Sequence, residues 1–218
     1  MKAWLPGIKV DNSNFTNALQ SYVKASEEAR NGKHKQALNN LNKAIDDLSK
    51  ISPKPQNTIL KWQAEVGATL YYNGLVEEGG QLLSNTYINL VNGSTIGNYV
   101  KTIAGYYYSD YLNYVGNNDR ALEVIDRTLP AGQQLIGFYL QAELLLRKAN
   151  TLNAQGKSAE QRVVANQLLQ LGQRQRDSYF MTQAYNSLGT SYLVSTDPAS
   201  RSSAKTNLEK ANNLATQN

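Results

Sequence analysis

The sequence predicts an all-α fold of about five helical hairpins, and three observations support this prediction. Glycines in similar turn contexts recur at spacings of 42, 42 and 40 residues: Gly32, Gly74, Gly116 and Gly156. A small residue stands seven positions before each of them: Ala25, Gly67, Ser109 and Ala149. Between the turns, apolar residues recur every three or four positions, the period of an amphipathic helix. Two helices joined by a tight glycine turn form each predicted hairpin.

Each turn separates a first helix from a second helix, and a fifth turn at Asp197-Pro198 stands about 41 residues after Gly156. The second helices show the clearest pattern, as in Leu41, Ala44 and Leu48. Ten helices are expected from the turns and the apolar spacing: 14–31, 34–50, 57–73, 75–92, 96–115, 118–129, 132–155, 158–172, 176–195 and 198–216.

A small residue also follows the first three glycines by five positions: Ala37, Gly79 and Ala121, with Gln161 in the fourth place. Small residues in mid-helix let two helices approach closely. Together with the aromatic-Leu-Gly-aromatic pattern from Tyr185 to Tyr192, the array resembles the tetratricopeptide repeat (TPR). The period of about 41 residues is longer than the usual 34 of that repeat. An irregular helical bundle is the alternative.

The resemblance implies a right-handed α-solenoid in which the first helix of each repeat lines a concave groove. It predicts a lead-in over residues 1–13 and one TPR-like domain over residues 14–217. The expected repeats are approximately 14–53, 57–94, 96–130, 132–172 and 176–216.

Register with that repeat selects the groove-facing positions of each first helix, and they are rich in Tyr and Asn. The partner-binding candidates are Tyr22, Arg30, Lys61, Tyr71, Tyr72, Tyr106, Asp110, Asn113, Tyr114, Asn150, Asn153 and Asn186. Tyrosine offers a wide, stiff contact surface with a hydroxyl, and an Asn amide can pair with both polar groups of a peptide backbone. We therefore expect a protein or peptide ligand. With only two cations among the candidates, capture of an acidic tail is disfavoured.

Composition argues against catalysis. The chain has no Cys and one His, which excludes thiolate chemistry and multi-histidine metal sites. The adjacent carboxylates, such as Glu27-Glu28 and Asp46-Asp47, point about 100° apart on a helix and form no catalytic dyad. No phosphate-binding, dinucleotide or metal motif is present. The sequence therefore predicts a non-enzymatic protein with no cofactor and no metal.

Charge and hydropathy narrow the remaining classes of protein that this sequence could belong to. The net charge of +5 is spread evenly along the chain, which disfavours nucleic-acid binding. The 24 Asn and 16 Gln outnumber the charged residues and predict a surface rich in neutral hydrogen-bonding groups. No apolar run is long enough for a transmembrane segment. The composition suits a cytoplasmic protein and, if a signal segment has been removed, a cell-envelope protein.

Two function hypotheses stay open at this point. The first is a protein–protein interaction scaffold or adaptor that holds a polypeptide in the groove. The second is a peptide-sensing module similar to those of bacterial quorum-sensing regulators. Residues 1–13 are too short for a helix-turn-helix, so in this hypothesis the module is separated from its DNA-binding part. Oligomeric state is left open by the sequence.

Overall fold

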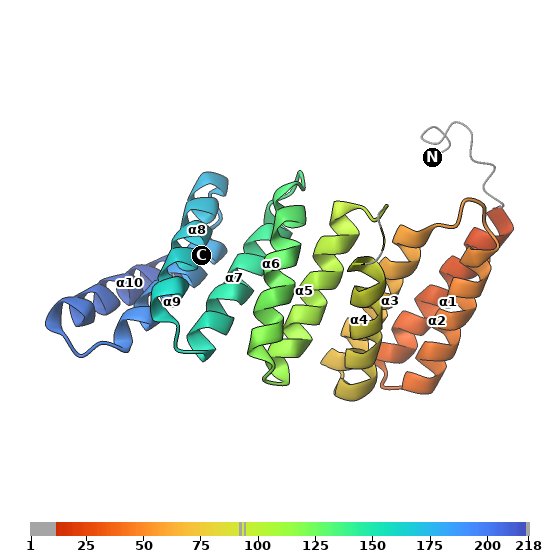
Figure 1. The fold of residues 1–218 in the computed structure, drawn as a ribbon, viewed down its shortest axis with the longest axis horizontal. Helices are drawn as coiled ribbons and strands as arrows, with labels where there is room; N and C mark the ends of the chain where they lie inside the picture. The colour runs from red at the N-terminus through yellow and green to blue at the C-terminus, as the bar shows by residue number, and fades with distance from the viewer. Residues whose placement is uncertain (1–11, 92, 94, 217–218) are drawn as a thin grey trace. The chain divides into compact units, whose positions relative to one another are not determined.

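The computed structural model describes residues 12–91, 93 and 95–216, and these form ten α-helices and no strand, which confirms the all-α prediction (Figure 1). Consecutive helices pair as hairpins. The helices are α1 (Asn12–Arg30), α2 (His34–Ser49), α3 (Gln56–Tyr72), α4 (Val76–Val91), α5 (Asn98–Tyr114), α6 (Asn118–Gln133), α7 (Tyr139–Ala154), α8 (Ser158–Gln175), α9 (Ser178–Leu193) and α10 (Pro198–Thr216). The predicted lead-in lies outside the described residues, except for Asn12 and Ser13, which begin α1.

The described residues divide into two compact units. Unit 1 ends at Val100 and contains α1 to α4. Unit 2 starts at Lys101 and contains most of α5 and the helices that follow. The core of unit 1 joins Leu41 and Leu48 of α2 to Trp62, Val66 and other residues of α3. The core of unit 2 includes Leu145 and Leu152 of α7, Leu168 of α8 and Phe180 of α9. Whether the repeats make one domain remains a prediction.

The four turn glycines adopt the left-handed backbone conformation, with φ between 69° and 87°. After each glycine, the next residue donates its N–H to the carbonyl five positions earlier, as in Lys33 to Glu28 at 2.8 Å and Leu75 to Leu70 at 3.0 Å. This is the Schellman ending of a helix, which favours glycine because a Cβ is unfavourable at positive φ. The recurring glycines therefore mark the hairpin turns, as predicted.

Small residues bring the helices of a hairpin together. In unit 1, a Cβ on Gly79 would lie 2.5 Å from the Tyr71 backbone nitrogen and 2.6 Å from the Gly67 carbonyl oxygen. In unit 2, a Cβ on Gly105 would lie within 2.1 Å of the Thr128 hydroxyl oxygen. Real Cβ contacts are essentially never this short, so a Cβ at either position would force the neighbouring atoms to shift.

The predicted boundary between the third and fourth repeats is wrong. We expected the second helix of repeat three to end before Pro130, but α6 continues through it to Gln133, and α7 begins at Tyr139 rather than at residue 132. Proline in the last helical turn removes one N–H, whereas Ala131 and Gly132 beyond it are buried, with Gly132 next to Thr102 of α5 and Leu144 of α7. Their packing offsets the loss of that hydrogen bond.

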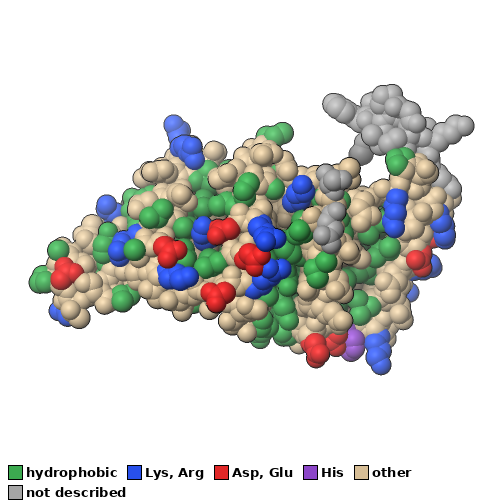
Figure 2. All heavy atoms as spheres, viewed as in Figure 1, with side chains coloured by type: hydrophobic (Ala, Val, Ile, Leu, Met, Phe, Trp, Pro, Cys, Tyr) green, Lys and Arg blue, Asp and Glu red, His purple; other side chains and the backbone are tan. Residues whose placement is uncertain are grey.

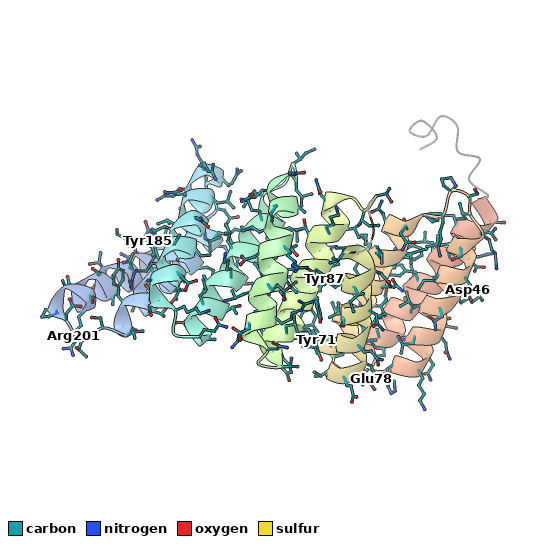
Figure 3. All side chains as sticks on the ribbon, viewed as in Figure 1. Asp46, Tyr71, Glu78, Tyr87, Tyr185 and Arg201 are labelled. Carbon is teal, nitrogen blue, oxygen red and sulfur yellow. The ribbon has the colours of Figure 1, made fainter. Side chains whose placement is uncertain are left out.

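The last hairpin turn has no glycine and is closed by side chains instead. The Ser200 N–H donates to Asp197 Oδ1 at 2.9 Å, a standard N-cap for α10. Hydrogen bonds from Ser195 and Ser200 lower the pKa of the Asp197 carboxyl. Tyr185 of α9 contacts α10, where the Lys210 ammonium lies 5.4 Å from its ring centroid (Figure 3).

Candidate polypeptide-binding face

The candidate site is the first-helix face, which we define as the side chains that α1 and α3 present in unit 1 and that α5, α7 and α9 present in unit 2. Two of its tyrosines end their helices and are strongly exposed: Tyr72 at 54% and Tyr114 at 66%. Arg30, Asn150 and Asn153 are exposed as well, and Asn186 is half-buried. These side chains are accessible to a partner.

Tyr22 joins the two first helices of unit 1. Its ring stacks on Trp62 of α3 with centroids 4.4 Å apart and planes 9° from parallel. Its hydroxyl donates to Glu65 Oε2 at 2.7 Å, while Lys61 Nζ lies 2.7 Å from the other carboxylate oxygen. The charges of Glu65 and Lys61 therefore neutralise each other at this contact.

Tyr71 is 8% exposed and does not offer its side chain to a partner. Its ring packs against that of Tyr72, with centroids 4.7 Å apart. The close approach of α4 to the Tyr71 backbone explains the burial, because the Gly79 crossing covers this part of α3. We therefore leave Tyr71 out of the contact surface.

Tyr106 joins α5 to α7 in unit 2 by a different set of groups. The Arg147 guanidinium lies 4.9 Å from the Tyr106 ring centroid, and its Nη2 donates to the tyrosine hydroxyl at 3.1 Å. The same guanidinium is paired with Asp110. Burial raises the pKa of Tyr106, and the charge of Arg147 works against that shift. Nearby, the Thr151 hydroxyl donates to Asn113 Oδ1 at 2.9 Å.

Glu143 of α7 is a further member of this face that is not among the twelve candidates selected from the sequence. It is 9% exposed. Tyr139 lies one helical turn before it, and the negative charge of Glu143 raises the pKa of Tyr139. Burial raises the pKa of Tyr179 on α9, and Glu143 contributes in the same direction. The charge of Glu143 thus acts on a tyrosine of its own helix and on one of α9.

Solved structures of similar architecture cover almost the whole chain. The nearly identical TPR-like repeats of a protein from Podosopora anserina align with a TM-score of 0.68 at 15% identity, over 91% of this chain and 95% of theirs. BtubC (BKLC) from P. vanneervenii gives a TM-score of 0.71 at 14% identity, over 95% and 92% of the two chains. The chain has the TPR-like fold.

MamA MSR-1 C2 is also similar, with a TM-score of 0.60 at 18% identity, over 92% of this chain and 97% of that one. No protein-family model matches the sequence, and no curated protein matches it either. The likeness therefore lies in the fold, with less than a fifth of the residues identical in each comparison.

An aromatic position that recurs along the sequence of the TPR-like repeats was missed by the sequence reasoning. Ten positions before the small residue of a first helix stands an aromatic residue in four of the five repeats, and all four are exposed: Phe15, Tyr99, Tyr139 and Tyr179. The 40-residue spacing of the last three was a readable signal. The reasoning overlooked it because the register carried over from the shorter repeat begins later in the helix.

Charged groups elsewhere in the TPR-like hairpins are paired or interleaved. Figure 2 shows acidic and basic side chains mixed over the part of unit 2 that contains α6 and α7. His34 Nε2 lies 3.9 Å from Glu78 Oε1, at the turn end of α4 (Figure 3). Within the described residues, no group of three or more His, Asp or Glu is placed to hold a metal ion. None of the helices described is long and apolar enough to cross a membrane.

Proposed function

We propose that this TPR-like chain is a non-catalytic scaffold that binds a segment of polypeptide along its first-helix face. The single observation that carries the proposal is the concentration of exposed tyrosines on first helices, at their ends in Tyr72 and Tyr114 and at the start of α7 and α9 in Tyr139 and Tyr179. Exposed aromatic residues are enriched at protein–protein interfaces, because they bury a large area at little cost in conformational entropy.

The neutral polar groups on the same face support an extended polypeptide as the ligand. Asn150 and Asn153 lie exposed on α7. Each amide can donate to a peptide carbonyl and accept from a peptide N–H. Such an amide recognises the peptide backbone rather than a particular side chain. The likeness to TPR-like structures is consistent with this role, and the concave groove remains part of the proposal.

Random 12-residue peptides displayed on phage and selected on the full chain test the proposal. We expect enriched peptides, and we expect the double variant Tyr72→Ala/Tyr114→Ala to bind them at least tenfold more weakly by fluorescence anisotropy. Both tyrosines are exposed, so the variant should retain its helical circular dichroism. Failure to enrich any peptide, or equal binding by the variant, would overturn the proposal.

Val163→Ala is the matched control. Val163 is an exposed apolar residue on α8, a second helix, so its replacement removes apolar surface outside the first-helix face. We expect the control to bind the selected peptides as the wild type does. A loss of binding equal to that of the tyrosine variant would place the binding surface elsewhere.

A further inference from the structure

Glu143 is a buried carboxylate for which no Lys or Arg of the described residues lies within ion-pair distance. The neighbouring cations of α7 are engaged elsewhere: Arg147 pairs with Asp110, and Lys148 Nζ lies 2.6 Å from Asp126 Oδ1 of α6. The packed helix α9 carries no charged residue at all. Burial of a carboxylate without a counter-charge is costly, so its retention in this position calls for an explanation.

Two exposed tyrosines belong to the same part of the face as Glu143: Tyr139, one turn earlier on α7, and Tyr179 on α9. Tyr139 and Tyr179 are 57% and 50% exposed, and both pack edge-on against the buried Phe180, with ring centroids 5.4 Å and 5.0 Å away. Phe180 therefore fixes the position of both rings. Glu143 lies four residues after Tyr139, on the same face of α7, and its charge raises the pKa values of both Tyr139 and Tyr179. We call the two exposed rings and the buried Glu143 side chain the Glu143 cluster.

We propose that the Glu143 cluster is the subsite for a lysine or arginine side chain of the bound polypeptide. The ligand cation stacks on the exposed rings of Tyr139 and Tyr179 and is held by the field of the carboxylate. This inference rests on the proposed function and names the side-chain chemistry that this part of the face selects. An acidic side chain is disfavoured at the same place, because it would meet the Glu143 carboxylate, which forms no ion pair within the described residues.

The chain already contains this mode of recognition next to the cluster. The Arg147 guanidinium covers the Tyr106 ring at 4.9 Å and pairs with the Asp110 carboxylate. A cation, a tyrosine ring and a carboxylate are therefore combined once within the fold. At the Glu143 cluster the ring and the carboxylate are present, and the proposal assigns the cation to the ligand.

Nuclear magnetic resonance of the full chain tests the subsite with two small probes. N-acetyl-arginine methylamide carries the cation, and N-acetyl-citrulline methylamide is its neutral isostere. We expect the arginine probe to shift the ring signals of Tyr139 and Tyr179 at concentrations at least tenfold lower than the citrulline probe. Equal shifts from both probes would overturn the subsite.

Glu143→Gln keeps the shape of the side chain and removes its charge, and we expect it to weaken the arginine probe at least tenfold. Unchanged binding by this variant contradicts the proposal. Should it fail to fold, Tyr179→Ser supplies the test, because Tyr179 is half exposed and its removal takes away one ring face. Val163→Ala is the control: Val163 is exposed on α8, outside the first-helix face, so probe binding should be unchanged in this variant.

The selected peptides separate this inference from the proposed function. We expect them to contain Lys or Arg, and substitution of that residue by citrulline or norleucine to weaken binding at least tenfold. Peptides that bind without a cation and are insensitive to Glu143→Gln overturn the subsite and leave the scaffold function standing. An arginine probe that binds while no peptide is selected overturns the polypeptide ligand in both proposals.

Discussion

In each unit a tyrosine of one first helix forms a hydrogen bond with a charged side chain of the next first helix. That side chain is acidic in unit 1 and basic in unit 2. In each unit a tyrosine three positions before the small residue of one repeat reaches the residue two positions before the small residue of the next repeat. In unit 1 this is Tyr22 donating to Glu65, and in unit 2 it is Tyr106 accepting from Arg147. The repeat register fixes which positions meet, whereas the charge of the partner is left to vary between repeats.

The helix crossings within the hairpins differ in a similar way. At Gly79 of unit 1 the neighbouring atoms belong to the backbone of α3, whereas at Gly105 of unit 2 they belong to the side chain of Thr128. A substitution cannot remove backbone atoms, but it can shorten a side chain. The comparison therefore predicts which crossing tolerates engineering.

Gly79→Ala should have the largest effect, destabilising the protein by about 3 kcal/mol or more, at the upper end of overpacking costs. Gly105→Ala should also destabilise, but the added Thr128→Ala substitution should recover part of the loss, because it removes the atoms nearest to the new Cβ. Thermal unfolding followed by circular dichroism at 222 nm measures both. Equal loss in Gly105→Ala with and without the second substitution would show that the two crossings are alike.

Arg147→Ala should cost about 2 kcal/mol, since it leaves Asp110 largely buried without its partner. The Asp110 side chain is 13% exposed in the pair and that of Arg147 is 21%. The double variant Arg147→Ala/Asp110→Ala should be more stable than the single variant, because no unpaired charge is left. Urea unfolding checks the order, and a double variant weaker than Arg147→Ala would refute this account of the unit 2 seam.

Tyr22→Phe should cost about 1 kcal/mol, the usual net value of one hydrogen bond. The substitution removes the hydroxyl that reaches Glu65 and preserves the stack on Trp62. Tyr22→Leu, which loses both, should be clearly less stable in the same urea series. If the two variants have the same urea midpoint, the Tyr22–Trp62 stack contributes nothing to stability. The two units then differ only in the hydrogen bond that joins their first helices.

The smallest expected effect is a loss of stability of unit 2 in alkali. The pKa values of Tyr106, Tyr139 and Tyr179 are raised in the folded chain above the ordinary value of 10.0. The corresponding stability is present below about pH 10, where unfolded tyrosine ionises, and is lost as the pH rises through the folded pKa values. Urea midpoints between pH 8 and pH 11 measure the loss, and Tyr139→Phe should flatten the curve.

Local signals made most of the fold predictable from the sequence. The turn glycines and the small residues at the crossings act through backbone conformation and close approach, which depend on a few neighbouring residues. The end of α6 was mispredicted because tertiary packing of Ala131 and Gly132 outweighs the local effect of Pro130. The end of α6 therefore depends on tertiary packing and could not be predicted from the local sequence pattern.

The candidate site was less predictable than the fold. The register located Tyr72 and Tyr114, whose exposure follows from their place at the helix ends. It could not distinguish Tyr71, which is buried, from Tyr72, which is exposed, because that depends on how closely α4 crosses α3. The isolation of Glu143 likewise depends on where Arg147 and Lys148 find their partners, and those partners lie on other helices.

The glycine turns also bear on how the chain is made. Each turn closes a hairpin from residues that follow one another directly, so no hairpin needs a later part of the chain to complete its own turn. Synthesis at about 5–20 residues per second delivers a repeat of this length in roughly 2–8 seconds, whereas helices form within about a microsecond. Each hairpin therefore has time to close before the next one is synthesised, so the order of synthesis is also an order of assembly.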